Sequence, residues 1–83
     1  MTHDCGEIVI ALRGLEQDFE VPRSVKLKIT QAIGVLENGD PLRIKLNRAL
    51  HDLESLGEDN NLQPMTRTAL LSVLSLIESK ANH

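Results

Sequence analysis

Three prolines, Pro22, Pro41 and Pro64, divide the chain into four segments, and each proline stands in front of an apolar pattern with helical spacing. Proline is tolerated at the first position of an α-helix because the N–H group that it lacks would have no intrahelical partner there. Inside a helix it removes a hydrogen bond and clashes with the preceding turn. The prolines therefore predict three helix starts, with one further helix before Pro22.

Apolar side chains recur at the helical period in every segment. In the first they are Ile8, Leu12, Leu15 and Phe19, which form one stripe. No stretch of strand length alternates convincingly between apolar and polar residues. The predicted helices are 4–18, 22–37, 41–56 and 64–80. Short loops between helices imply antiparallel neighbours, so we expect one all-α domain over 1–83, an up-and-down four-helix bundle.

Local residues predict how individual helices begin and end. Asp4, followed by Glu7 three residues later, fits a capping box at the first helix. Gly39 is expected to end the second helix in the left-handed conformation. Asp40 is expected to cap the third helix and Gly57 to end it.

The chain also contains an internal repeat. The sequence ALRGLE, from Ala11, matches ALHDLE, from Ala49, and each is followed by a loop and a proline-started helix. This pattern predicts two similar helical hairpins, one after the other. Two repeats are too few for a solenoid, so packing of the hairpins into one bundle is favoured.

Composition argues against several classes of function. The formal net charge is −3 and Phe19 is the single aromatic residue, whereas nucleic-acid-binding domains carry a basic excess and single-strand binders carry aromatic platforms. A lone cysteine, Cys5, excludes an internal disulfide and fits a reducing compartment. The apolar run 8–12 is too short to span a membrane and follows acidic residues, so it does not resemble a signal peptide. We expect a cytoplasmic protein.

Several short stretches resemble a known family. VPRSVK, NGDP, ALHDLE and QPMTRTALL, with LIE near the end, resemble uncharacterised protein family zero-one-four-seven, a set of small archaeal proteins. The resemblance extends from Ile8 to Glu78. It implies a compact four-helix bundle, sometimes grouped with the bromodomain-like bundles. It implies no activity, because the family has none assigned.

Three basic residues, Arg23, Lys26 and Lys28, follow the first proline. On a helical wheel at ~100° per residue, Arg23 and Lys26 fall on one side of the buried stripe and Lys28 on the other. The helix dipole disfavours cations in the first turns. We therefore expect an acidic neighbour, either Asp18 and Glu20 or a partner, and a solvated helix flank is the simpler interpretation.

Arg67 lies between two threonines at the start of the last helix. Free backbone N–H groups there would suit an anion. Alternatively, the threonines cap the helix and Arg67 pairs with the acidic loop Glu58–Asp59, which we favour. Arg23, Lys26 and Arg67 remain the candidate contacts for a partner or an anion.

Neither a metal site nor a catalytic site is predicted. His3, His51 and His83 are scattered, without the spacing that metal ligands show. Cys5 has no base fixed beside it, and a nucleophile needs an oriented partner. The glycines are dispersed rather than gathered in a phosphate-binding loop. We therefore expect no catalytic residue, no cofactor and no small-molecule substrate.

The last helix carries more apolar surface than a bundle requires. Its apolar residues cover ~220° of the wheel, against the ~100–140° that packing in a bundle needs. The excess predicts a self-association surface that includes Ala69, Leu71 and Leu76, aided by close approach at Gly14 and Gly34.

The sequence thus favours a small, non-enzymatic interaction or scaffold module that forms a homodimer and has an unidentified protein partner. The alternative is an accessory protein, associated with nucleic acid or the ribosome, that docks through its basic helix starts. We expect no membrane contact.

Overall fold

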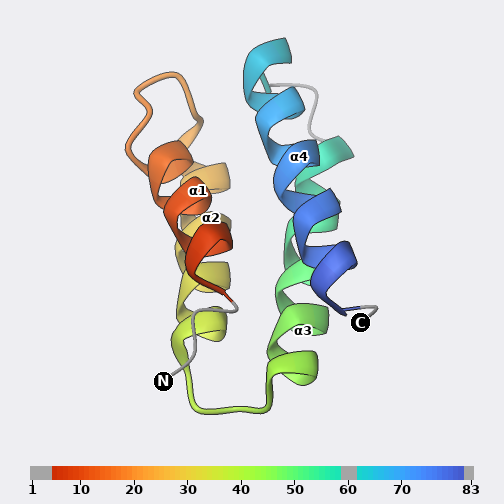
Figure 1. The fold of residues 1–83 in the computed structure, drawn as a ribbon. Coiled ribbons are helices and arrows are strands. Elements are labelled where there is room, and N and C mark those ends of the chain that lie inside the picture. The colour runs from red at the N-terminus through yellow and green to blue at the C-terminus, as the bar shows by residue number, and fades with distance from the viewer. Residues whose placement is uncertain (1–4, 59–61, 82–83) are drawn as a thin grey trace.

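The computed structural model describes residues 5–58 and 62–81 of the protein. The four helices run up and down, each antiparallel to its neighbour in sequence (Figure 1). They are α1 (Gly6–Glu16), α2 (Arg23–Glu37), α3 (Leu42–Glu54) and α4 (Pro64–Ala81), with a short 3₁₀ helix, η1 (Ser55–Glu58), after α3. The predicted all-α four-helix bundle is confirmed, and the described residues contain no strand.

Each helix buries most of the apolar stripe that its periodicity predicted. The largest side chains with almost no exposed surface come from all four helices: Ile8, Leu12, Val25, Ile29, Leu36, Leu46, Leu53, Leu70 and Ile77. Burying one such side chain stabilises the fold by about 1.5–3 kcal/mol. These residues form a single aliphatic core between the helices.

The end of α1 differs from the prediction, because the helix stops at Glu16 and the chain then turns. The amide of Asp18 bonds the Leu15 carbonyl, and the Asp18 carboxylate accepts a hydrogen bond from the amide of Glu20 at 2.9 Å. Phe19 lies in this turn with 99% of its surface exposed. Its placement in the buried stripe was wrong, because Asp18 stabilises a turn where the prediction continued the helix. The predicted cap at Asp4 lies outside the described residues.

The loop between α2 and α3 also forms differently. Gly39 was predicted to adopt the left-handed conformation, but no described glycine has a positive φ. The side chains of Asn38 and Asp40 shape the turn instead: Asn38 accepts a hydrogen bond from the Asp40 amide at 2.8 Å and donates one to the Asp40 carboxylate at 3.2 Å. Asp40 therefore does not cap α3; Pro41 holds the cap position.

The prolines mark helix starts to within one residue. Pro22 and Pro41 occupy the cap position, with their carbonyls accepting the first intrahelical bonds, so α2 and α3 begin one residue later than predicted. Pro64 is the first residue of α4, as predicted. The predicted third helix is divided, because its last turn tightens into η1, which contains Gly57.

The interhelical contacts are uneven. The contact of α2 with α3 is the most extensive, and that of α1 with α4 is the sparsest among adjacent helices. The two repeats differ accordingly: Ala49 is fully buried, whereas its counterpart Ala11 only borders the core. Across the residues described, no helix has the length and apolar content needed to cross a membrane.

Candidate functional site

An apolar groove runs between α1 and α4, the adjacent helices that contact each other least. It has a volume of about 320 Å³. Its lining residues are Ala11, Gly14 and Leu15 from α1, and Ala69, Ser72, Val73 and Leu76 from α4. Apart from the Ser72 hydroxyl, these side chains are apolar or absent, and none carries a charge. We refer to these seven residues as the α1–α4 groove.

Gly14 opens the groove on the α1 side. A Cβ atom built on Gly14 would meet no heavy atom within 4 Å, so no packing inside the protomer requires a glycine there. Gly34 has the same open surroundings. It lies on the exposed side of α2, however, about 140° from the buried Ile29 on the wheel.

The structure brings together three of the five residues predicted for self-association. Gly14, Ala69 and Leu76 all line the α1–α4 groove. Leu71, with 52% of its surface exposed, lies about 140–160° around α4 from Ala69 and Leu76. Leu71 and Gly34 are therefore separate from the groove.

Exposed residues border the α1–α4 groove at both ends. On the helical wheel, Ile10 is about 40° from Gly14, and Met65 is about 40° from Ala69. Ile10 and Met65 have 72% and 85% of their surfaces exposed. Glu7 and Lys80 lie on the same flanks of their helices, at the end of the bundle where α1 begins and α4 ends (Figure 1).

The basic start of α2 has no acidic partner within the described residues. Arg23 is exposed and Lys26 is half-buried, and neither forms an ion pair or side-chain hydrogen bond in the described parts of the chain. The first turn of α2 contains no acidic residue that would balance the helix dipole. The predicted pairing with Asp18 or Glu20 is therefore not formed.

Arg67 is engaged within the protein. Its guanidinium donates a hydrogen bond to the backbone carbonyl of Gly57 in η1. Thr66 is buried, and the Thr68 hydroxyl donates to the Pro64 carbonyl at 3.0 Å. Arg67 therefore connects α4 to η1 through a carbonyl acceptor. Of the acidic partners that we favoured, Asp59 lies outside the described residues, and Thr68 donates back to a carbonyl instead of capping the helix.

A second hollow, the acidic pocket, lies between α2 and the end of α3. It has a volume of about 280 Å³ and is lined by Lys28, His51, Asp52, Glu54, Ser55 and Glu58. Lys28 thus faces acidic side chains of its own chain. In the part of the chain that the structure describes, no group of His, Cys, Asp and Glu has a geometry suited to a metal ion.

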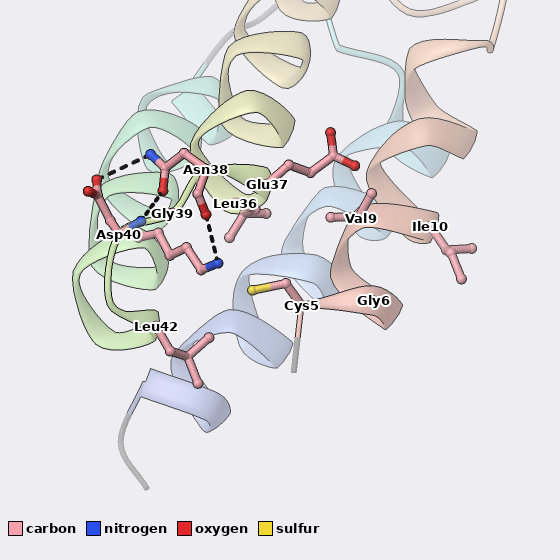
Figure 2. Close-up of a pocket in the computed structure, with 11 residues that line it drawn as sticks. Cys5, Gly6, Val9, Ile10, Leu36, Glu37, Asn38, Gly39, Asp40 and Leu42 are labelled. Atoms are coloured by element: carbon pink, nitrogen blue, oxygen red, sulfur yellow. Dashed lines mark hydrogen bonds between the residues drawn. The ribbon is translucent and has the colours of Figure 1, made fainter. Parts of the chain in front are cut away.

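A larger hollow, of about 820 Å³, lies where the start of α1 meets the α2–α3 loop (Figure 2). Cys5 and Val9 lie on one side of it and Asn38 and Asp40 on the other. The polar groups are engaged in holding the loop, because Lys45 Nζ donates to the Asn38 carbonyl at 3.2 Å and Asp40 pairs with Arg48 at 3.5 Å. The hollow therefore presents few polar groups that converge on its interior.

Residues with catalytic potential lie apart from one another. Cys5 lines the hollow beside the α2–α3 loop, whereas His51 lines the acidic pocket. The Glu16 carboxylate accepts a hydrogen bond from the Thr30 hydroxyl and lines neither hollow. These three residues do not form one site, whereas general acid–base or nucleophilic catalysis requires adjacent groups.

The sequence did not predict two features. One is that Ala11 and Ser72 line the α1–α4 groove; their small size and their position beside Gly14 and Ala69 on the wheel were the available signal. The other is the hydrogen-bonded turn at Asn38 and Asp40. There the spacing of two short polar side chains around a glycine was the signal, since such side chains can bond the backbone two residues away.

Comparisons with known proteins give a consistent result. The profile of the Uncharacterised protein family (UPF0147) matches residues 2–79. A UPF0147 protein of Thermococcus kodakarensis is 39% identical over 64 residues, which cover 75% of this chain and 76% of that relative. One from Methanosarcina mazei is 28% identical over 69 residues, covering 82% and 74%.

A UPF0147 protein of Methanopyrus kandleri is 35% identical over 63 residues, which cover 75% of this chain but only 61% of that relative. No solved structure matches the chain significantly. Since the family profile spans nearly the whole chain, this protein belongs to the uncharacterised family UPF0147.

Proposed function

We propose that the chain is a small, non-enzymatic interaction module of the cytoplasm that associates with a second copy of itself through the α1–α4 groove. The observation that carries the proposal is the uncharged, apolar lining of this groove. The cores of protein interfaces are depleted of charge and more apolar than the surrounding surface. The separation of Cys5, His51 and Glu16 supports a non-enzymatic role.

Gly14 provides a second line of support. A glycine inside a helix lowers its stability by about 0.5–1 kcal/mol relative to alanine. The surroundings within the protomer do not require this glycine, since a Cβ atom would meet nothing within 4 Å. Close approach of a partner helix to the bare backbone of α1 would explain its presence.

The size of the face indicates a weak dimer. At 1.5 Å per residue, α1 is about 16 Å long and α4 about 27 Å, and together they present a face about 20 Å wide. Two such faces bury roughly 900–1,000 Å² in total, which is at the lower limit for a specific interface. We therefore expect a dissociation constant in the micromolar range, about 1–100 µM.

Sedimentation equilibrium of the full chain between about 1 and 500 µM, a range chosen to bracket this affinity, tests the proposal. The informative variant is Gly14→Leu, which fills the groove, and its matched control is Gly34→Leu. Both leucines replace helical glycines with open surroundings, so both should fold. We expect the wild type and Gly34→Leu to dimerise and Gly14→Leu to remain monomeric.

A wild-type chain that stays monomeric over the whole range would refute self-association. Equal weakening by both leucine variants would refute the assignment of the interface to the α1–α4 groove. Circular dichroism on the same samples shows whether each variant keeps its helical content, so loss of folding is not mistaken for loss of association.

A second candidate function rests on Arg23 and Lys26, which have no ion-pair partner among the described residues. An exposed arginine beside a half-buried lysine suits an accessory role with nucleic acid or the ribosome. Binding of this kind weakens steeply with salt, because counterions are released from the phosphates. Binding of RNA at 50 mM salt that is lost at 200 mM and abolished in Arg23→Ala/Lys26→Ala would support this role, and no binding at 50 mM would exclude it.

A further inference from the structure

We infer that the two copies are related by a two-fold axis parallel to the helices, so that α1 of each copy packs against α4 of the other. The inference rests on the self-association proposed above and adds the relative orientation of the copies. It follows from the charged residues that lie at the ends of the α1–α4 groove.

Among the residues that the structure describes, Glu7 and Lys80 are the charged ones that flank the groove at one end. On the helical wheel, Glu7 lies about 20° from Gly14, and Lys80 lies about 20° from Ala69. Both belong to the end of the bundle where α1 begins and α4 ends (Figure 1). Glu7 is exposed and Lys80 half-buried. At the opposite end, α1 is followed by the exposed acidic residues Asp18 and Glu20.

Two arrangements bring the groove of one copy face to face with the groove of another. If the two-fold axis runs parallel to the helices, like ends meet and α1 faces α4 of the second copy. Glu7 then lies opposite Lys80 of the second copy, and the symmetry forms this pair twice.

If the axis instead runs across the helices, opposite ends meet and α1 faces α1 of the second copy. Glu7 then approaches Asp18 and Glu20 of the second copy, again twice. Opposite charges attract, whereas like charges in an interface cost free energy and exclude wrong orientations. The charges therefore favour the axis parallel to the helices.

The apolar residues fit the same arrangement. Because like ends meet, Ile10 comes to the level of Leu76 of the second copy, and Met65 comes to the level of the turn that follows α1 of the second copy. Leu76 is half-buried, so its remaining surface is available for the contact with Ile10.

The resulting interface resembles a second four-helix bundle. It contains α1 and α4 from each copy, and every helix is antiparallel to both of its neighbours, as in up-and-down bundles. The small residues of the groove allow the helices to approach closely at the centre, and the charged pairs lie at the rim.

Charge reversal tests the axis. We expect Glu7→Lys and Lys80→Glu each to weaken the dimer about five- to tenfold, since each replaces two attractive pairs by two repulsive ones at the rim. The double variant Glu7→Lys/Lys80→Glu re-forms both pairs and should dimerise within about twofold of the wild type. The controls are Glu78→Lys and Arg43→Glu, which reverse exposed charges away from the groove and should change the affinity by less than about twofold.

The sign of the Glu7→Lys effect distinguishes the two arrangements. Tighter association of this variant would overturn the inference, because it would place Glu7 next to Asp18 and Glu20. A wild-type dimer that responds to neither reversal would also overturn it, while leaving self-association intact. A monomeric wild type would refute both.

Disulfide cross-linking gives a second measurement. In a Cys5→Ser background, the single variants Glu7→Cys and Lys80→Cys are mixed and oxidised. The parallel axis predicts a covalent dimer in the mixture and none in either variant alone. A covalent dimer in neither sample, at concentrations where the wild type sediments as a dimer, would contradict it.

Discussion

The guanidinium of Arg67, in the first turn of α4, donates a hydrogen bond to the backbone carbonyl of Gly57 in η1. The bond joins the start of α4 to η1, the short helix that follows α3, although residues 58–66 separate the two partners in the sequence. It gives Arg67 a structural role in a place where the helix dipole alone disfavours a cation. Arg67 therefore differs from Arg23, although both stand just after a proline-marked helix start.

Arg67→Ala should lower the free energy of unfolding by about 1.5–3 kcal/mol, because it removes a charge-assisted hydrogen bond to a partly buried carbonyl. Arg67→Lys should recover part of this loss, since lysine keeps the charge but not the planar fork. Urea denaturation followed by circular dichroism measures both. A loss below about 0.5 kcal/mol for Arg67→Ala, the usual scatter of surface substitutions, would show that the bond does not stabilise the fold.

Arg23→Glu should have the opposite effect. Arg23 has no acidic partner within the described residues, and it opposes the dipole of α2 in the first turn. Replacing it with an acid should raise the free energy of unfolding by about 0.3–1 kcal/mol at low salt, and less in 1 M NaCl. If the substitution destabilises the protein, Arg23 is paired within the chain after all.

Gly14→Ala and Gly34→Ala should stabilise the protomer similarly, by about 0.5–1 kcal/mol each. Both glycines lie inside helices, and a Cβ atom at either position would meet nothing within 4 Å. Thermal unfolding at low concentration, where the protein is monomeric, measures the two effects. A destabilising alanine at either position would reveal a close contact that the structure does not contain.

Phe19→Ala should leave the free energy of unfolding within about 0.5 kcal/mol of the wild type, as expected for an exposed position. Phe19 has 99% of its surface exposed, whereas Leu15, one turn earlier, has 9%. Leu15→Ala should therefore cost about 2–5 kcal/mol. Chemical denaturation of the two variants side by side measures both changes in the free energy of unfolding. A loss of about 3 kcal/mol for Phe19→Ala, typical of a buried phenylalanine, would show that Phe19 is buried in the core.

Helical periodicity and the prolines were sufficient to predict the helices and their buried stripes, because burial of an apolar stripe decides where a helix packs. Phe19 is a residue for which periodicity gave the wrong prediction. Its spacing continues the stripe of α1, but the hydrogen bond from the Glu20 amide to Asp18 stabilises a turn instead. The prediction of a left-handed conformation at Gly39 was wrong for a similar reason, because the side chains of Asn38 and Asp40 on either side of it shape the turn.

The candidate interface was only partly predictable. The helical wheel placed Ala69 and Leu76 in an apolar arc wider than a bundle needs. It could not indicate that the contact with α1, rather than with α3, would leave them partly exposed. That depends on how extensively each pair of helices packs, and the α1–α4 contact is much sparser than the α2–α3 contact. Leu71 and Gly34 are also apolar or small, but their own positions on the helical wheel place them on other faces, so the sequence already allowed them to be separated from the groove.

The uneven packing of the helices has a consequence for the order in which the protein opens. With 11 residues, α1 is the shortest α-helix that the structure describes, and its contact with α4 is the sparsest between adjacent helices. A helix of this length is marginal in isolation, so we expect backbone amides of α1 to exchange with deuterium through local opening, before those of α2 and α3. A second copy bound across α1 and α4 would slow this exchange. Because proteases cleave the locally opened chain, association would then also lower the rate of proteolysis in the cell.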